Sequence, residues 1–148
     1  MTDLDFYFDP ICPFAWMTSK WVRQVAEQRS YAVEWRFISL RMVNAGVDYA
    51  THFPPGYEKS HSAGLALLRV AAAVRGTTGT AGVAAYYEAV GTAIFERVPT
   101  KPESALDDPR SLAGAALAAA SLDVGLADAV QGAEFDSLRV RALISRAV

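Results

Sequence analysis

Three segments with different hydrophobic patterns open the chain. The aromatic-rich run LDFYFD, residues 4–9, stops at Pro10 and predicts a short strand. Apolar side chains then recur every three or four residues and predict an amphipathic helix over residues 12–28. The run YAVEWRFISL, residues 31–40, alternates apolar and polar side chains and predicts a second strand. Together they predict a βαβ unit with parallel strands and a right-handed connection. The apolar positions of the expected helix are Phe14, Met17, Trp21, Val22 and Val25.

The pattern changes after residue 40. Residues 44–60 carry two glycines and a Pro-Pro pair, which predict a loop. The glycine-rich run at residues 76–82 lacks the lysine of a phosphate loop and predicts a turn. We therefore predict an α/β fold with no third strand: an N-terminal part over residues 1–44 and a helical part over residues 45–148. The helices expected in the second part span residues 62–75, 81–97, 108–122 and 126–148, with a break near Gly132.

The composition and the charge of the chain exclude some classes of function. The chain has 148 residues, 52% of them hydrophobic, and a formal net charge of −2 without any basic run, which argues against nucleic acid or a membrane surface as partner. Its most apolar stretch, residues 63–74, contains Arg69 and is shorter than the roughly 20 apolar residues that span a bilayer. The acidic N-terminus lacks the features of a secretory signal. We expect a cytoplasmic protein.

Cys12, in the run FDPICPFAW, is the only cysteine. An internal disulfide and a cysteine-based zinc cluster are thereby excluded, so a redox role requires a second thiol from another molecule. Cys12 lies where a strand ends and a helix begins, and Pro13 takes the favoured first helical position. The free N–H groups and the positive dipole end of a helix N-terminus stabilise a thiolate. The alternative is an inert cysteine in the core.

The run DFYFDPICPFAW, followed by a helix, a strand and a helical segment, resembles the DsbA-like branch of the thioredoxin superfamily. It is most similar to the actinobacterial members that include the mycothiol-dependent nitroreductases, and is related to kappa-class glutathione transferases and 2-hydroxychromene-2-carboxylate isomerases. The resemblance implies a thioredoxin-like βαβ unit with an inserted all-helical domain. It also implies Cys12 as nucleophile, Pro13 and Phe14 between the two cysteine positions, and Ala15 in place of the resolving cysteine.

With Ala15 in that position, the resemblance implies a monothiol cycle. A thiol-disulfide oxidoreductase of this kind uses a low-molecular-weight thiol, such as mycothiol or glutathione, as cosubstrate, and holds no metal or flavin of its own. Its substrate would be a small aromatic compound or a disulfide. Relatives continue into a strand preceded by a cis-proline, another strand and a last helix. We expect these elements to be missing here, and the sheet edge to be covered, for instance in a homodimer.

Other residues near Cys12 are candidates for substrate binding. Phe14 and Trp16 would wall an aromatic pocket, or else pack in the core. Asp9, next to Pro10, would contact substrate or tune the thiol, or else cap the turn before the helix. Tyr86 would line a cleft between the two parts of the chain, with core packing as the default.

Two further functions stay open. A kappa-type transferase or isomerase would activate a thiol without a disulfide step, although those relatives generally carry serine where Cys12 stands. A truncated, non-catalytic paralogue would act as a binding or dimerisation module. The histidines, His52 and His61, flank the Pro-Pro loop at a spacing that fits no common metal motif, so no metal site is predicted and both are expected to be solvated.

Overall fold

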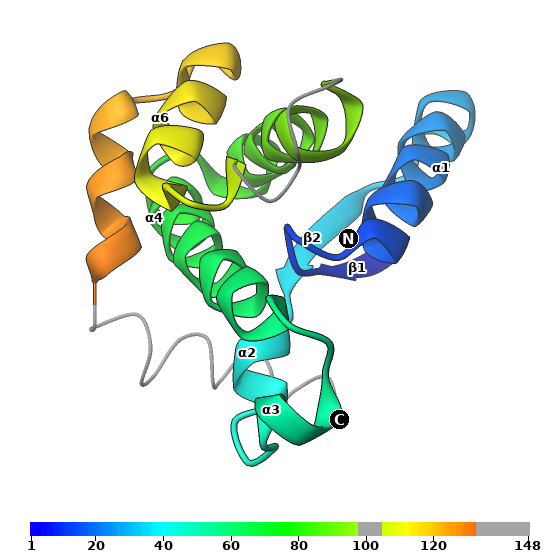
Figure 1. Ribbon diagram of the computed structural model, residues 1–148. Coiled ribbons are helices and arrows are strands. Elements are labelled where there is room, and N and C mark those ends of the chain that lie inside the picture. The colour runs from blue at the N-terminus through cyan, green and yellow to red at the C-terminus, as the bar shows by residue number, and fades with distance from the viewer. Residues whose placement is uncertain (98–104, 133–148) are drawn as a thin grey trace.

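The computed structural model describes residues 1–97 and 105–132. Strand β1 (Leu4–Phe8), helix α1 (Pro13–Arg29) and strand β2 (Val33–Phe37) follow one another, and the two strands pair in parallel from Leu4 with Val33 to Phe8 with Phe37 (Figure 1). This confirms the predicted βαβ unit. The sheet has two strands, and the rest of the described chain adds none.

Two short helices follow β2. Helix α2 (Leu40–Val43) begins where the Ser39 hydroxyl accepts from the N–H of Met42, and helix α3 (Tyr49–His52) begins at Asp48 in the same manner. Side-chain oxygens at these positions bond the free N–H groups of the first turn. The loop predicted over residues 44–60 therefore missed α3, whereas α2 precedes that loop.

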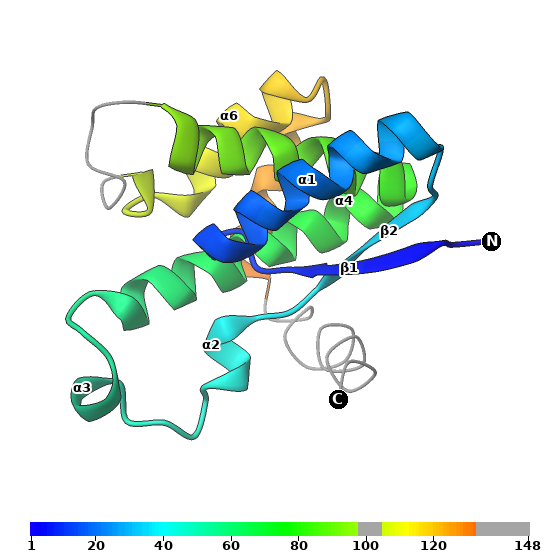
Figure 2. The ribbon, with the colours of Figure 1, turned by 90° about the vertical axis from the view of Figure 1, so that its right-hand side faces the viewer.

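Helix α4 (Tyr57–Gly91) spans most of the two predicted helices and the turn predicted between them. The two helical parts meet at Gly79, inside the predicted turn, where the non-helical φ of 69° and ψ of −160° bend the chain. The predicted break is therefore present, but it is a kink at one residue, because the rest of residues 76–82 stays helical. Figures 1 and 2 show the parts of α4 on either side of the bend running in different directions. A change of direction therefore needs one residue rather than a loop.

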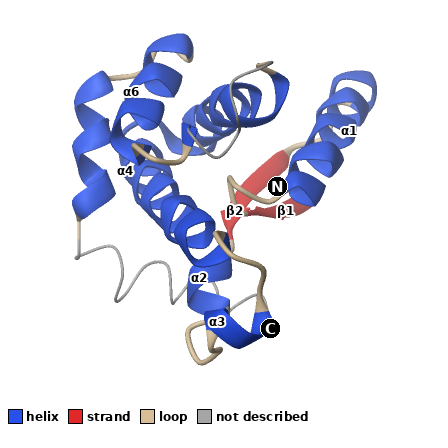
Figure 3. Cartoon of the chain, viewed as in Figure 1, coloured by secondary structure: helices blue, strands red, loops and turns tan. Residues whose placement is uncertain are grey.

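Three smaller elements complete the helical part: the π-helix η1 (Thr92–Glu96), α6 (Pro109–Ala119) and the 3-10 helix η2 (Val124–Gln131). The predicted last helix begins in η2, and its remainder, residues 133–148, lies outside the described residues. The fold is mixed α/β and mostly helical (Figure 3), consistent with a thioredoxin-like fold. Within residues 1–97 and 105–132, no helix is both long and apolar enough to cross a membrane.

One hydrophobic core joins the sheet to the helices. The ring of Phe8 on β1 stacks on that of Tyr87 on α4, with centroids 3.9 Å apart and planes 18° apart, and both side chains are completely buried. Trp35 on β2 meets the same tyrosine edge-on at 5.8 Å. The second part of α4 therefore packs directly on the sheet.

Helix α1 buries only part of the predicted apolar face. Val22 is buried as expected, but Phe14, Met17 and Trp21 are 82%, 64% and 62% exposed. Trp16 and Ser19 are buried in their place. The apolar spacing is correct for a helix, but α4 packs on the adjacent face. The spacing of the apolar residues therefore predicted the helix correctly, but it did not predict which of its side chains face the core.

We predict that Gly79→Ala lowers the free energy of unfolding by about 1 to 3 kcal/mol, because alanine strongly disfavours this backbone conformation. Urea denaturation measures the change. The control is Gly76→Ala on the same helix, which has open space and no positive φ, and should be neutral or stabilising by up to about 1 kcal/mol. Equal stability of the two variants would contradict a bend that depends on glycine.

Candidate functional site

Cys12 is the N-cap of α1, half-buried, with Pro13 as the first helical residue. Its N–H donates to the carbonyl of Asp9 at 3.0 Å, and its own carbonyl accepts from the N–H of Trp16 at 3.0 Å. Its sulfur caps no N–H of the helix. The turn therefore holds the backbone of Cys12 while leaving the thiol at the helix N-terminus free for other contacts.

Asp9 fixes this turn from inside. Its side chain is 1% exposed; Oδ1 accepts from the N–H of Ile11 at 3.2 Å and Oδ2 from the N–H of Leu40 at 2.8 Å. The carboxylate thereby joins the turn after β1 to the segment after β2, and the predicted capping role is observed. Burial raises the pKa of Asp9 to about 6, although the two N–H groups act in the opposite direction. Pro10 is buried beside it.

Two glycines let α4 approach the Cys12 turn closely. A Cβ at Gly64 would lie 2.5 Å from Oδ1 of Asp9 and 2.7 Å from Cγ1 of Ile11. A Cβ at Gly91 would lie 2.1 Å from the ring of Trp16. Any larger residue would push the turn away from α4. The only sequence signal for these contacts was the presence of glycine inside a helical pattern.

Trp16 lies in the core beneath the turn rather than in the wall of an open pocket. Its Nε1 donates to Oε1 of Glu96 at 2.9 Å, and the same oxygen pairs with Nζ of Lys20 at 2.8 Å. The ring of Phe95 stacks on it with centroids 6.1 Å apart. These contacts hold η1 against α1. The exposed aromatic side chain next to Cys12 is that of Phe14.

The adjacent tyrosines on α4 are both completely buried. Tyr86, predicted as a possible cleft residue, donates its hydroxyl to the carbonyl of Leu67 at 3.2 Å, so the structure places it in the core. The hydroxyl of Tyr87 has no hydrogen-bond partner within the described part of the chain, and burial raises the pKa of this phenol. No sequence signal separated the two, because they are neighbours in an apolar helix.

The histidines occupy different environments. His52 is exposed, as expected, but the prediction that His61 is solvated is wrong. His61 is buried on α4, and its Nδ1 shares a hydrogen bond of 2.9 Å with the hydroxyl of Tyr49. Aromatic rings close around it at centroid distances of 5.5 to 5.7 Å. Residues 1–97 and 105–132 contain no cluster of three metal-ligating side chains.

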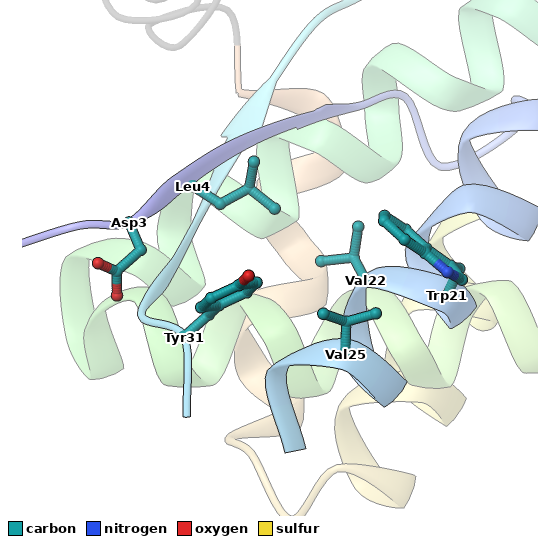
Figure 4. Close-up of a pocket in the computed structure, with 6 residues that line it drawn as sticks. All are labelled: Asp3, Leu4, Trp21, Val22, Val25 and Tyr31. Carbon is teal, nitrogen blue, oxygen red and sulfur yellow. The ribbon is translucent and has the colours of Figure 1, made fainter. Parts of the chain in front are cut away.

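A shallow hollow of about 340 Å³ lies between β1 and the outer face of α1, away from the Cys12 turn (Figure 4). Tyr31 and Leu4 face Trp21 and Val25 across it. Its lining is apolar apart from Asp3, whose Oδ2 already accepts from the N–H of Ala32. It therefore offers no group that could assist chemistry at Cys12.

A parallel βαβ unit whose helix begins at a half-buried cysteine defines a protein of mixed α/β fold with a thiol site, consistent with the thioredoxin-like class. The chain belongs to the Rv2466c-like family, whose model is described as mycothiol-dependent nitroreductase Rv2466c and matches residues 11–147. This confirms the resemblance to that family; the wider kinship with kappa-class transferases stays a prediction.

A relative from Mycobacterium tuberculosis strain H37Rv, the uncharacterized protein Rv2286c, is 35% identical over 130 residues. The match covers 86% of this chain and 53% of the relative. The chain thus spans about half of the length of that protein.

We predict that the buried carboxyl of Asp9 makes stability depend on pH between about 4 and 6. Because the folded state raises its pKa from 3.8 to about 6, the folded protein binds this proton more tightly than the unfolded chain. The free energy of unfolding should therefore fall as pH rises through this range, by about 2 to 3 kcal/mol at most. Urea denaturation at several pH values should show this fall in the wild type and not in Asp9→Asn. The same pH dependence in both proteins would contradict it.

We predict that Gly91→Ala lowers the free energy of unfolding by about 1 to 3 kcal/mol, because the added methyl group overlaps the ring of Trp16. Denaturant unfolding followed by circular dichroism gives the value. Gly114→Ala on α6 is the control: its Cβ would meet Ala127 at an ordinary 3.9 Å, so no loss is expected. A loss of equal size in the control would show that helical glycines matter here for another reason.

Proposed function

We propose that this chain carries the thiol site of an oxidoreductase that works with a low-molecular-weight thiol, mycothiol or glutathione. Cys12 is the nucleophile. The observation that carries the proposal is a half-buried cysteine at the N-terminus of a long helix, in a chain that belongs to a family named for mycothiol-dependent reduction. The chain spans about half of the length of Rv2286c, so the substrate and the activity of the whole protein are also part of this proposal.

The surroundings of Cys12 favour a reactive thiol. Helix α1 is 17 residues long and carries no acidic residue in its first turn, so the positive end of its dipole is not neutralised there. The sulfur is not used as a helix cap, and Pro13 and Phe14 beside it are exposed, so a small molecule can reach it. These are the conditions under which thiolates attack disulfides.

The proposed cycle needs one protein cysteine. The Cys12 thiolate attacks one sulfur of a small disulfide, a mixed disulfide forms at Cys12, and the other half leaves as a thiolate. A second molecule of the small thiol then attacks the mixed disulfide, which restores Cys12 and yields a new small disulfide. Ala15 cannot perform this second attack, so it must come from outside the chain.

The substrate surface is assigned to the exposed side of the turn. Phe14, 82% exposed beside Cys12, offers a ring to an aromatic substrate. Asp9, Pro10 and Trp16 are buried, so their proposed role is to support the turn from beneath and not to touch substrate. Tyr86 is too deeply placed for contact and has no part in the proposal.

We predict that incubation with mycothiol disulfide or glutathione disulfide adds one thiol residue per chain, and that dithiothreitol removes it. Intact-mass spectrometry measures the adduct, which Cys12→Ser should abolish. Ala15→Cys adds a matched test: a cysteine at this position should clear the adduct from within and leave a disulfide between residues 12 and 15.

Absence of an adduct in the wild type at any disulfide concentration would overturn the oxidoreductase. Turnover of an aromatic substrate that survives Cys12→Ser would instead indicate a transferase or isomerase. An adduct on Ala15→Cys that persists like that of the wild type would contradict the role given to position 15.

A further inference from the structure

The two edges of the sheet differ in how the described chain protects them. On the outer edge of β2, Arg75 from α4 donates a hydrogen bond to the carbonyl of Trp35 and pairs with Glu34 at 3.2 Å. Within residues 1–97 and 105–132, no strand pairs with the outer edge of β1. Proteins usually protect such an edge with proline, lysine, a bulge or a covering element, because it pairs readily with another strand. Strand β1 contains neither proline nor lysine.

The outer edge of β1 offers backbone groups that another strand can bond. Leu4 through its N–H and Phe8 through its carbonyl bond the residues that flank β2. Since successive residues of a strand direct their N–H and C=O groups to opposite sides, Asp5 and Tyr7 direct theirs to the outer edge. This edge is therefore a template for one more strand.

An apolar surface continues from this edge onto α1. Met17 and Trp21 are neighbours four residues apart on the helix, 64% and 62% exposed. Leu4 and Tyr31, which line the same hollow as Trp21, are 36% and 47% exposed (Figure 4). These four residues, the α1–β1 patch, expose on the order of 400 Å² of mainly apolar surface, which is within the range of the largest patch on a typical monomer.

Charge on this surface does not oppose contact between two copies of the chain. Asp5 points to the face of the sheet opposite to Leu4, where Arg36 pairs with it at 2.9 Å. The exposed polar side chains beside the patch on α1 are uncharged: Thr18, Gln24 and Gln28. The formal net charge of −2 adds little repulsion.

We propose that the outer edge of β1 and the α1–β1 patch form the interface of a symmetric dimer, with a second copy of this chain as the partner. A two-fold interface must complement itself. When two copies of β1 run antiparallel about an axis at Phe6, Asp5 lies opposite the partner's Tyr7, and the outward N–H and C=O groups of both are satisfied. The two patches then lie on the same face of one continuous sheet.

The surface has the size and composition that such a dimer needs. Specific interfaces bury about 800 Å² on each partner, with an apolar centre and a polar rim. The α1–β1 patch supplies about half of that area, and the edge of β1 with the uncharged side chains beside the patch supplies the rest. Figure 1 shows α1 and β1 together on one side of the molecule, with α6 and η2 on the other.

Sedimentation velocity over a range of protein concentrations measures the association, with dithiothreitol present to prevent a disulfide between copies. The wild type should form a reversible dimer. Trp21→Lys should raise its dissociation constant at least about tenfold, because tryptophans at an interface centre carry much of the binding energy. Val124→Lys is the matched control: Val124 is 55% exposed on η2, outside the patch, so no change is expected. Circular dichroism checks that both variants fold.

Amide hydrogen exchange followed by NMR locates the interface. The N–H of Tyr7 points to the outer edge of β1, so it should exchange fast in a dilute monomer and slowly when two copies pair. The N–H of Phe6, on the side of β1 that bonds β2, should be protected in every sample and is the internal control. Protection at Tyr7 should therefore rise with protein concentration.

A chain that stays monomeric at every concentration overturns the proposal. A dimer that Trp21→Lys leaves unchanged, or in which the Tyr7 amide stays unprotected, overturns it as well, since the copies would then meet elsewhere. A protected Tyr7 amide in a monomer would show that another segment of the same chain covers the edge, which also contradicts the dimer. The reactivity of Cys12 enters neither measurement, so these outcomes leave the proposed function untouched.

Discussion

The structure depends on the close packing of the Cys12 turn against helix α4. Glycines at positions 64 and 91 remove the side chains that would separate the two, so Asp9 and Trp16 reach the surface of the helix. Between these contacts Tyr87 stacks on Phe8 and ties the helix to the sheet. In a close-packed interior, a shift of one element displaces the elements that contact it. The turn, the sheet and the helical part are therefore held as one body around the thiol.

A buried carboxyl holds the turn that carries Cys12. Both carboxylate oxygens of Asp9 accept hydrogen bonds from backbone N–H groups, and these bonds fix the turn. The burial that this position requires raises the pKa of the carboxyl. The N-terminus of α1 lies at the same turn, and it favours negative charge on the sulfur of Cys12.

The sequence predicted the sheet more completely than the packing of the helices. The alternation in residues 31–40 and the run 4–9 predicted both strands and their parallel pairing, because local pattern and a crossover helix fix that unit. The stripe of Phe14, Met17 and Trp21 predicted a helix but not its buried face, since the packing partner lies far away in sequence. The burial of His61 was missed for the same reason, whereas the glycine-rich run at residues 76–82 did indicate the bend at Gly79, because that signal is local.

The sequence by itself determined the βαβ unit, the place of Cys12 at the start of a helix, and the absence of a second cysteine, because each is a local property of the chain. Only the tertiary structure decided that Trp16 and Tyr86 belong to the core while Phe14 faces outward. It also decided that Tyr86 donates its hydroxyl to the carbonyl of Leu67, whereas the hydroxyl of its neighbour Tyr87 has no hydrogen-bond partner among the described residues. These distinctions depend on how a distant helix approaches, and no local pattern encodes that approach.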